Sequence, residues 1–177
     1  MAFSGENINE YELRINEIEQ LRIVGRTSEA ITECAAAIDR AVKNNSLTEE
    51  MKARNVLADI HRCNGVFDEV LPHYSKVIEL GRKYNLRFSD EYIHALYHTV
   101  VFMTRIQPPP PQMFTLIDEL VEVRSQMVDG DENDKDLQDY KKMQEVLKRT
   151  YKRKHRLRKQ KKYTYTYIVG IVKNELK

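Results

Sequence analysis

The chain has 177 residues, and 41% of them are aliphatic, aromatic or cysteine, which excludes a disordered protein. Only 6 Gly and 5 Pro occur, so most of the sequence is open to helix formation and an all-α fold is favoured. Two cysteines are too few for a disulfide framework, and no apolar run approaches the roughly 20 residues that span a bilayer. The N-terminus lacks the basic start and apolar run of a secretory signal, so we expect a soluble protein of the cytoplasm or nucleus.

The net charge of +2 conceals a strong asymmetry along the chain. Residues 148–177 hold 12 Lys and Arg against one acidic residue, a net charge of +11, whereas residues 1–147 carry a net charge of −9. An acidic body with a basic C-terminal extension suggests that the extension has an electrostatic role.

Four helices are predicted in the first half of the chain, because apolar residues recur there at spacings of three and four. Gly25 is expected to end the first helix, Asn44–Asn45 the second and Cys63–Gly65 the third, and the segment from Gly81 to Asn85 is the expected exit of the fourth. Cys34 and Cys63 both fall at positions that we expect to face the core. The predicted helices begin near Asn9, at Thr27 or Ser28, near Ser46 and at Phe67.

The second half of the chain begins with a fifth predicted helix, which Ser89 and Asp90 would cap. The proline run 108–111 interrupts the pattern and leads into a sixth helix, whose apolar residues lie between Met113 and Val123. After an acidic loop, a long final helix is predicted, with Lys and Arg dominating its C-terminal part. The following Tyr-rich segment alternates with period two and is typical of a β-strand.

Two stretches forty residues apart share one layout, in which a glycine separates two helical patterns and small or β-branched residues follow at fixed spacing. The matching positions are Gly25, Ala30 and Ala37 in the first stretch and Gly65, Val70 and Val77 in the second, with Leu57, Ala58 and Tyr74 at further matching sites. This layout resembles the tetratricopeptide repeat over residues 11–85. The resemblance implies antiparallel helix hairpins stacked as a short solenoid, with a groove lined by the first helix of each pair.

The resulting domain organisation has four parts. A helical domain of three hairpins is predicted over residues 8–128, followed by an acidic loop over 129–135. A long helix ending in a basic run is predicted over 136–162, and a strand-like tail over 163–177. In the helical domain, the resemblance implies a partner groove lined by Ile15, Glu19, Lys52, Asn55 and Asp59. The Lys, Asn and Arg clamp with which many tetratricopeptide domains hold a C-terminal carboxylate is missing at the corresponding positions, so that ligand is rejected.

No catalytic or metal-binding set is recognised in the sequence. His94 and His98 lie four residues apart and could share one helix face, but no nearby acidic residue or cysteine completes a metal site, so we interpret them as partly buried or surface histidines. His61 and Cys63 are two residues apart and fall on different faces, which argues against a nucleophile and base pair. We therefore predict a protein that is not an enzyme and has no cofactor or metal.

The basic run is the strongest local signal. Ten cations within fifteen residues repel one another and favour a polyanion such as RNA or DNA, with affinity that falls steeply as salt rises. A nuclear import signal, a solvated tail and docking onto the acidic body are the other interpretations. The predicted polyanion-binding residues are Lys148, Arg149, Lys152, Arg153, Lys154, Arg156, Arg158, Lys159, Lys161 and Lys162.

The strand-like tail is expected to pair with the sheet edge of a partner or with a copy of itself, because an isolated strand leaves its backbone groups unpaired. The residues expected to pair are Tyr163, Tyr165, Tyr167 and Val169. The sequence thus predicts an adaptor that binds a protein partner through its helical domain and uses its C-terminal extension for assembly. A nucleic-acid-associated factor is the main alternative, and a peripheral membrane adaptor is a lesser one.

Overall fold

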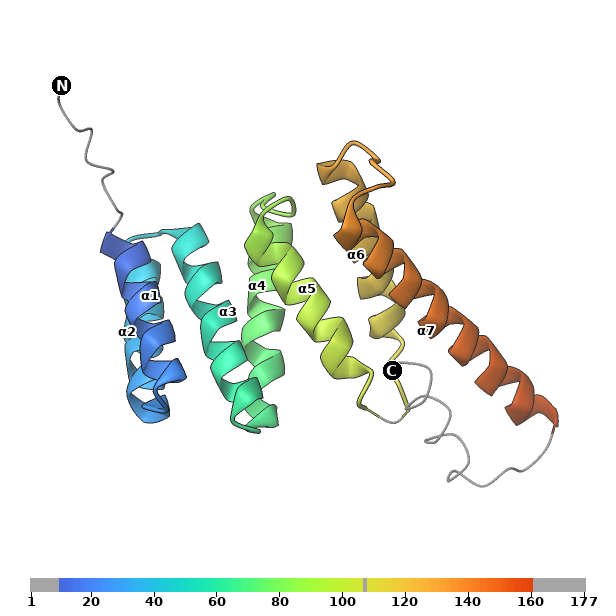
Figure 1. Cartoon of the computed structure of the whole chain (residues 1–177), viewed down its shortest axis with the longest axis horizontal. Coiled ribbons are helices and arrows are strands. Elements are labelled where there is room, and N and C mark those ends of the chain that lie inside the picture. The colour runs from blue at the N-terminus through green and yellow to red at the C-terminus, as the bar shows by residue number, and fades with distance from the viewer. Residues whose placement is uncertain (1–9, 107, 161–177) are drawn as a thin grey trace. The chain divides into compact units, whose positions relative to one another are not determined.

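The computed structural model describes residues 10–106 and 108–160, and for residues 152–160 it describes the backbone alone. Every regular element in these ranges is helical, which confirms the predicted all-α class (Figure 1). The predicted strand over 163–172 lies outside the described residues. None of the helices in the described ranges is both long and apolar enough to cross a membrane. The chain divides into two compact units, Met1–Thr99 and Val100–Lys177, and each is described separately.

Within its described residues, the first unit contains four complete helices and most of a fifth. They are α1 (Glu10–Ile23), α2 (Thr27–Lys43), α3 (Leu47–Cys63), α4 (Val70–Lys83) and the part of α5 (Asp90–Met103) up to Thr99, with a short 3-10 helix, Phe67–Glu69, before α4. Consecutive helices alternate in direction, so α1, α3 and α5 run the same way (Figure 1). Helix α3 packs against α1, α2 and α4.

The helices end as the sequence predicts, because residues that tolerate a positive φ follow them. Gly25 and Gly65 have φ of +79° and +75°, and Asn45 has φ of +52°. At the end of α1, the N–H of Arg26 donates to the carbonyl of Leu21, which satisfies a carbonyl that the helix leaves free. The same bond, from Val66 to His61, ends α3.

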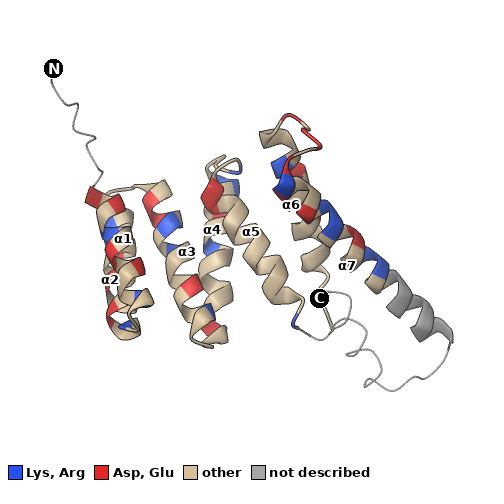
Figure 2. Cartoon of the chain, viewed as in Figure 1, with Lys and Arg blue, Asp and Glu red and all other residues tan. Residues whose placement is uncertain are grey.

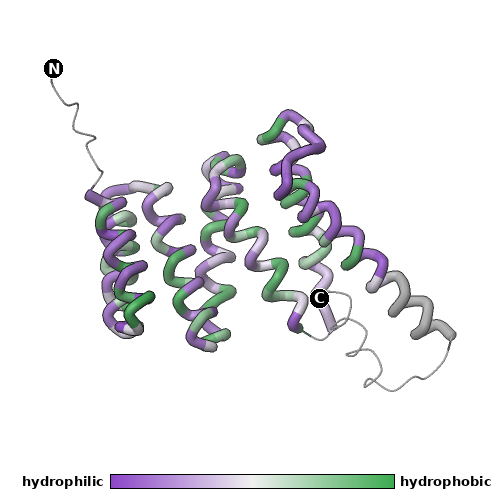
Figure 3. The backbone as a smooth tube through the Cα atoms, in the orientation of Figure 1, coloured by the Kyte–Doolittle hydropathy of each residue, from purple (hydrophilic) through white to green (hydrophobic). Residues whose placement is uncertain are grey.

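Hydrophobic and hydrophilic residues alternate along α2, α3 and α4, as amphipathic helices require (Figure 3). The apolar faces of α1, α2 and α3 form a core of small and branched side chains, which lets these helices approach closely. Buried members of this core are Ile15, Ile18, Ala30, Cys34, Ala37, Ile38, Ala53, Leu57 and Ile60. Cys34 is therefore a core residue as predicted, whereas Cys63 is exposed at the end of α3, which corrects the prediction for that position.

The exit of α4 lies within the predicted segment from Gly81 to Asn85, but it does not lie at Gly81 itself. Helix α4 continues through it to Lys83, and Asn85, with φ of +58°, terminates the helix instead. Gly81 is buried, and the ring of Tyr92 on α5 lies against its backbone where any side chain would otherwise be. The glycine therefore permits a close approach of α4 and α5.

The second unit contains α6 (Gln112–Met127) and α7 (Lys135–Gln160), which pack against each other. Asp134 begins α7, since its carboxylate accepts a 2.8 Å hydrogen bond from the N–H of Leu137. The same carboxylate accepts hydrogen bonds from Nε and Nη2 of Arg124 on α6, at 2.9 and 2.6 Å. This bidentate pair fixes the connection between the two helices.

Candidate functional site

A cluster of polar and aromatic side chains on α3, α4 and α5 centres on Asp59 in the first unit. The Asp59 carboxylate is largely buried, and each of its oxygens has its own partners. Oδ1 accepts hydrogen bonds from the Tyr74 hydroxyl at 2.7 Å and from Nη2 of Arg62 at 2.8 Å. Oδ2 lies 2.8 Å from Nε2 of His94. The cluster thus joins three helices through one carboxylate.

His98 completes the cluster one helical turn after His94. The centroids of the two imidazole rings are 4.3 Å apart, and the His98 ring stacks on Tyr74 with an interplanar angle of 12°. One ligand atom from each of Asp59, His94 and His98 can be chosen so that all three atoms lie within 4.8 Å of one another. Among the described residues, this is the group whose donors are placed to hold a metal ion.

Burial and neighbouring side chains shift the pKa values of Asp59, Tyr74 and His98. Burial raises the pKa of Asp59, but its hydrogen bonds to His94, Tyr74 and Arg62 outweigh burial and hold the pKa well below the ordinary carboxyl range. Burial, reinforced by the Asp59 carboxylate, raises the pKa of Tyr74 far above its usual value. Burial and the neighbouring His94 lower the pKa of His98 to about 4, so this imidazole is neutral at pH 7.

His94 and His98 are partly buried, as the sequence predicts, but an acidic residue does lie beside them. Apart from Asp90 and Glu91 in its first turn, α5 has no carboxylate, so the sequence around the histidines offers no third ligand. A carboxylate beside His94 comes instead from Asp59 on α3, 35 positions earlier in the chain. A separation of 35 residues does not by itself indicate that two side chains lie close together. The only hint was that Asp59 falls on the face of α3 predicted to line the groove.

The predicted groove residues mostly make contacts between helices or within the core. Ile15 is buried, and Glu19 accepts a hydrogen bond from Arg22 on its own helix. Lys52 on α3 donates to Glu12 on α1 with an Nζ to Oε1 distance of 2.7 Å. The Asn55 side chain donates to the carbonyl of Glu91 on α5 at 2.9 Å. These contacts, with those of Asp59, tie α3 to its neighbours.

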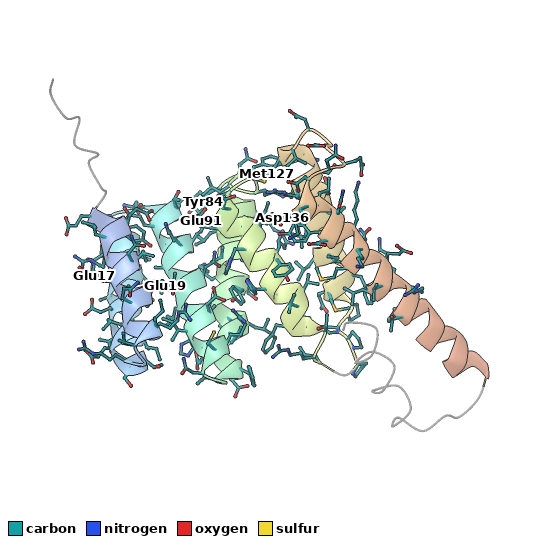
Figure 4. The ribbon with its side chains drawn as sticks, in the orientation of Figure 1. Glu17, Glu19, Tyr84, Glu91, Met127 and Asp136 are labelled. Atoms are coloured by element: carbon teal, nitrogen blue, oxygen red, sulfur yellow. The ribbon has the colours of Figure 1, made fainter. Side chains whose placement is uncertain are left out.

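An open groove of about 810 Å³ lies instead along α1 and the start of α2. Its apolar members Leu13 and Val24 have exposed fractions of 46% and 65%. Figure 4 shows Glu17, which lines this groove, and Glu19 on opposite sides of α1, with Glu19 on the side of α3. The remaining lining residues are Arg14, Asn16, Ile18, Gln20, Leu21, Arg26 and Glu33.

The predicted polyanion-binding residues begin where the packed part of the second unit ends. Lys148 forms a 2.6 Å ion pair with Asp118 on α6, and Leu147 is the last buried residue of α7 in the described range. Figure 2 shows acidic and basic residues interleaved along α1 and α3. By sequence, residues 148–162 hold basic residues and no acidic residue. The predicted residues from 152 to 159 lie on α7, and Lys161, Lys162 and the four strand-pairing residues lie outside the described residues.

Comparisons of the chain with protein-family models, with curated proteins and with solved structures find no match.

Proposed function

We propose that this protein is a non-enzymatic adaptor, and that it binds an amphipathic helix of a partner protein in the groove along α1. The groove of about 810 Å³ is the observation that carries the proposal. Its exposed apolar residues, Leu13 and Val24, are of the kind that anchors a helix in a groove. The charged residues that line the groove are of both signs, so they would favour a partner helix that also has acidic and basic residues.

The composition of α1 supports this role. Ile15 and Ile18 pack into the core, while Leu13 on the helix and Val24 directly after it are exposed. A helix at the edge of a bundle ordinarily has one apolar face, so apolar residues on a second side favour a second packing partner. Helix α1 has 14 residues, a length of about 21 Å, which is enough for three to four turns of a docked helix.

A tetratricopeptide-like arrangement of the first unit is part of this proposal. Glycines with positive φ after α1 and α3, and the buried Ala30, Ala37, Val70 and Val77 at the matching positions, support it. In this arrangement α1 with α2 and α3 with α4 are hairpins, and repeat proteins of this kind bind partners along their helical surfaces.

The test is site-specific photo-cross-linking of the full chain in cells of its source, with p-benzoylphenylalanine at position 13. Position 42 is the matched control, because Val42 is 49% exposed on α2 and does not line the groove. We expect a discrete adduct with one other protein from position 13 only, and its loss with Val24→Glu but not with Val42→Glu. The same adducts from both positions, or adducts only within the chain, would contradict the proposal.

A nucleic-acid-binding role is a second proposal, favoured by the length of α7. Near the start of α6, Phe114 contacts Tyr151, with ring centroids 4.6 Å apart. Helix α7 continues for nine residues beyond Tyr151, about 13 Å, and six of them are Lys or Arg. A basic helical extension past its packing partner suits contact with the phosphates of RNA or DNA.

This second proposal predicts a specific salt response. Binding of a labelled single-stranded RNA is measured by fluorescence anisotropy over a range of KCl concentrations. Lys152→Gln with Lys154→Gln should reduce the slope of log affinity against log salt by about 1.4, from two lost phosphate contacts. Lys43→Gln with Lys142→Gln changes the net charge equally and should leave the slope unchanged. Equal slopes for both variants would contradict the proposal.

A further inference from the structure

We infer that Asp59, His94 and His98 form a binding site for a divalent transition-metal ion, with Zn²⁺ as the representative ion. The site is independent of the groove on α1 and of the basic extension. It stands on the meeting of three donors, one carboxylate oxygen from α3 and two imidazole nitrogens from α5, within 4.8 Å of one another. Two imidazoles and a carboxylate are a common ligand set for zinc.

Small side-chain movements convert this cluster into a coordination sphere. Zinc–ligand distances of about 2.0–2.2 Å place the donors of a tetrahedral ion about 3.3 Å apart. Nε2 of His94 and Oδ2 of Asp59, now 2.8 Å apart, would separate by about half an ångström as the metal replaces the proton between them. The His98 donor must approach by no more than about 1.5 Å, which imidazole rotation provides at a spacing of one helical turn.

The surroundings of Asp59 hold the carboxylate in a suitable orientation. Tyr74 and Arg62 both donate to Oδ1, so the carboxylate plane is fixed and Oδ2 is directed to the histidines. Hydrogen bonds to the second oxygen of a ligating carboxylate commonly orient it in metal sites. The stack of His98 on Tyr74 restrains the remaining ligand in the same way.

The donor set also decides which ions the site accepts. Imidazole nitrogen suits Zn²⁺, Cu²⁺, Ni²⁺ and Co²⁺, whereas Ca²⁺ and Mg²⁺ prefer sites made of oxygen alone. The Arg62 guanidinium offsets part of the Asp59 charge, so we expect micromolar rather than nanomolar affinity. The His94 side chain is 37% exposed, which leaves solvent access to a fourth coordination position. A bound ion would tie α3 to α5 within the first unit.

The experiment is isothermal titration of the full chain with Zn²⁺ after treatment with a chelator, supported by the visible spectrum of bound Co²⁺. We expect one site for the wild type and at least a tenfold loss of affinity for His94→Ala, His98→Ala and Asp59→Asn. Asp59→Asn keeps the shape of the side chain, and circular dichroism of each variant verifies that it is folded.

The chain provides a matched control in a second pair of neighbouring histidine rings. His61 and His73 have ring centroids 5.8 Å apart with an interplanar angle of 7°, yet they do not belong to the three-donor cluster. The variant His61→Gln/His73→Gln/His155→Gln retains only His94 and His98 and should bind one ion with unchanged affinity. Loss of binding in this control, or unchanged binding in folded His94→Ala/His98→Ala, would overturn the inference. Absence of Zn²⁺ and Co²⁺ binding by the wild type would overturn it as well.

Discussion

Gly81 offers a direct test of how α4 and α5 pack. In an exposed helix, Gly→Ala stabilises by about 1 kcal/mol, because alanine has the higher helix propensity. At position 81, however, an added Cβ would lie 2.7 Å from Cε2 and 3.2 Å from Cγ of Tyr92, and closer still to Cδ2. The Tyr92 ring is fully buried, and its hydroxyl accepts a 3.3 Å hydrogen bond from Nε of Arg82, so it has little freedom to move away.

The two effects oppose each other, and their magnitudes decide the sign. Overpacking of a dense core costs about 1–3 kcal/mol, and a Cβ well inside contact distance of a ring belongs at the upper end of that range. After subtraction of the propensity gain, Gly81→Ala should lower the free energy of unfolding by about 2 kcal/mol. For a chain of this length, that corresponds to a melting temperature lower by about 4–8 °C.

A double-mutant cycle with Tyr92→Leu provides the assay, with unfolding followed by circular dichroism in urea. In the Tyr92→Leu background, the clash is absent and Gly81→Ala should stabilise by up to about 1 kcal/mol. The sign of the same substitution thus reverses, with a coupling free energy of about 3 kcal/mol. If Gly81→Ala stabilises the wild type, or if its effect is equal in both backgrounds, the described approach of α4 to Tyr92 is refuted.

Three further predictions concern single side chains. Hydrogen bonds from Arg124 and from a backbone N–H lower the pKa of Asp134. The stability that its carboxylate contributes is therefore present above the ordinary carboxyl pKa of about 4 and is lost as the pH falls below it. The difference in melting temperature between wild type and Asp134→Asn should shrink over the same fall in pH. Burial raises the pKa of Cys34 to about 12, so a thiol reagent at pH 8 should modify exposed Cys63 rapidly and Cys34 only in denaturant. Rapid reaction of two thiols in the folded chain would contradict the burial of Cys34. Gly65 has φ of +75° and open space around its Cα, so Gly65→Ala should cost about 1 kcal/mol in urea unfolding and Gly65→Asn distinctly less.

The ends of the helices could be predicted from the sequence because they depend on local chemistry. A helix followed by glycine or asparagine ends where that residue adopts a positive φ, and Gly25, Asn45 and Gly65 all do so. The apolar periodicity of α1 to α4 likewise predicts which faces enter the core, since it is set within each helix. These features need no knowledge of how distant segments meet.

The features that the sequence did not reveal depend on contacts between helices. Gly81 resembles a helix stop, and only the position of Tyr92 on the next helix shows that it is a packing site. Asp59 resembles any solvated helical carboxylate until α5 places His94 at hydrogen-bonding distance. In both cases the partner lies on another helix, and the sequence alone does not specify which residues of two helices face each other.

The polar face of α3 explains why the predicted groove and the groove in the structure differ. Lys52, Asn55 and Asp59 recur at spacings of three and four, so they form one stripe along α3. The side chains of this stripe form hydrogen bonds with Glu12 on α1 and with both Glu91 and His94 on α5. Side chains engaged in such contacts would lose their existing partners if they bound an external protein, which opposes binding at this face. The apolar residues that α1 exposes on its other side carry no such cost, and they are the better place to expect a partner.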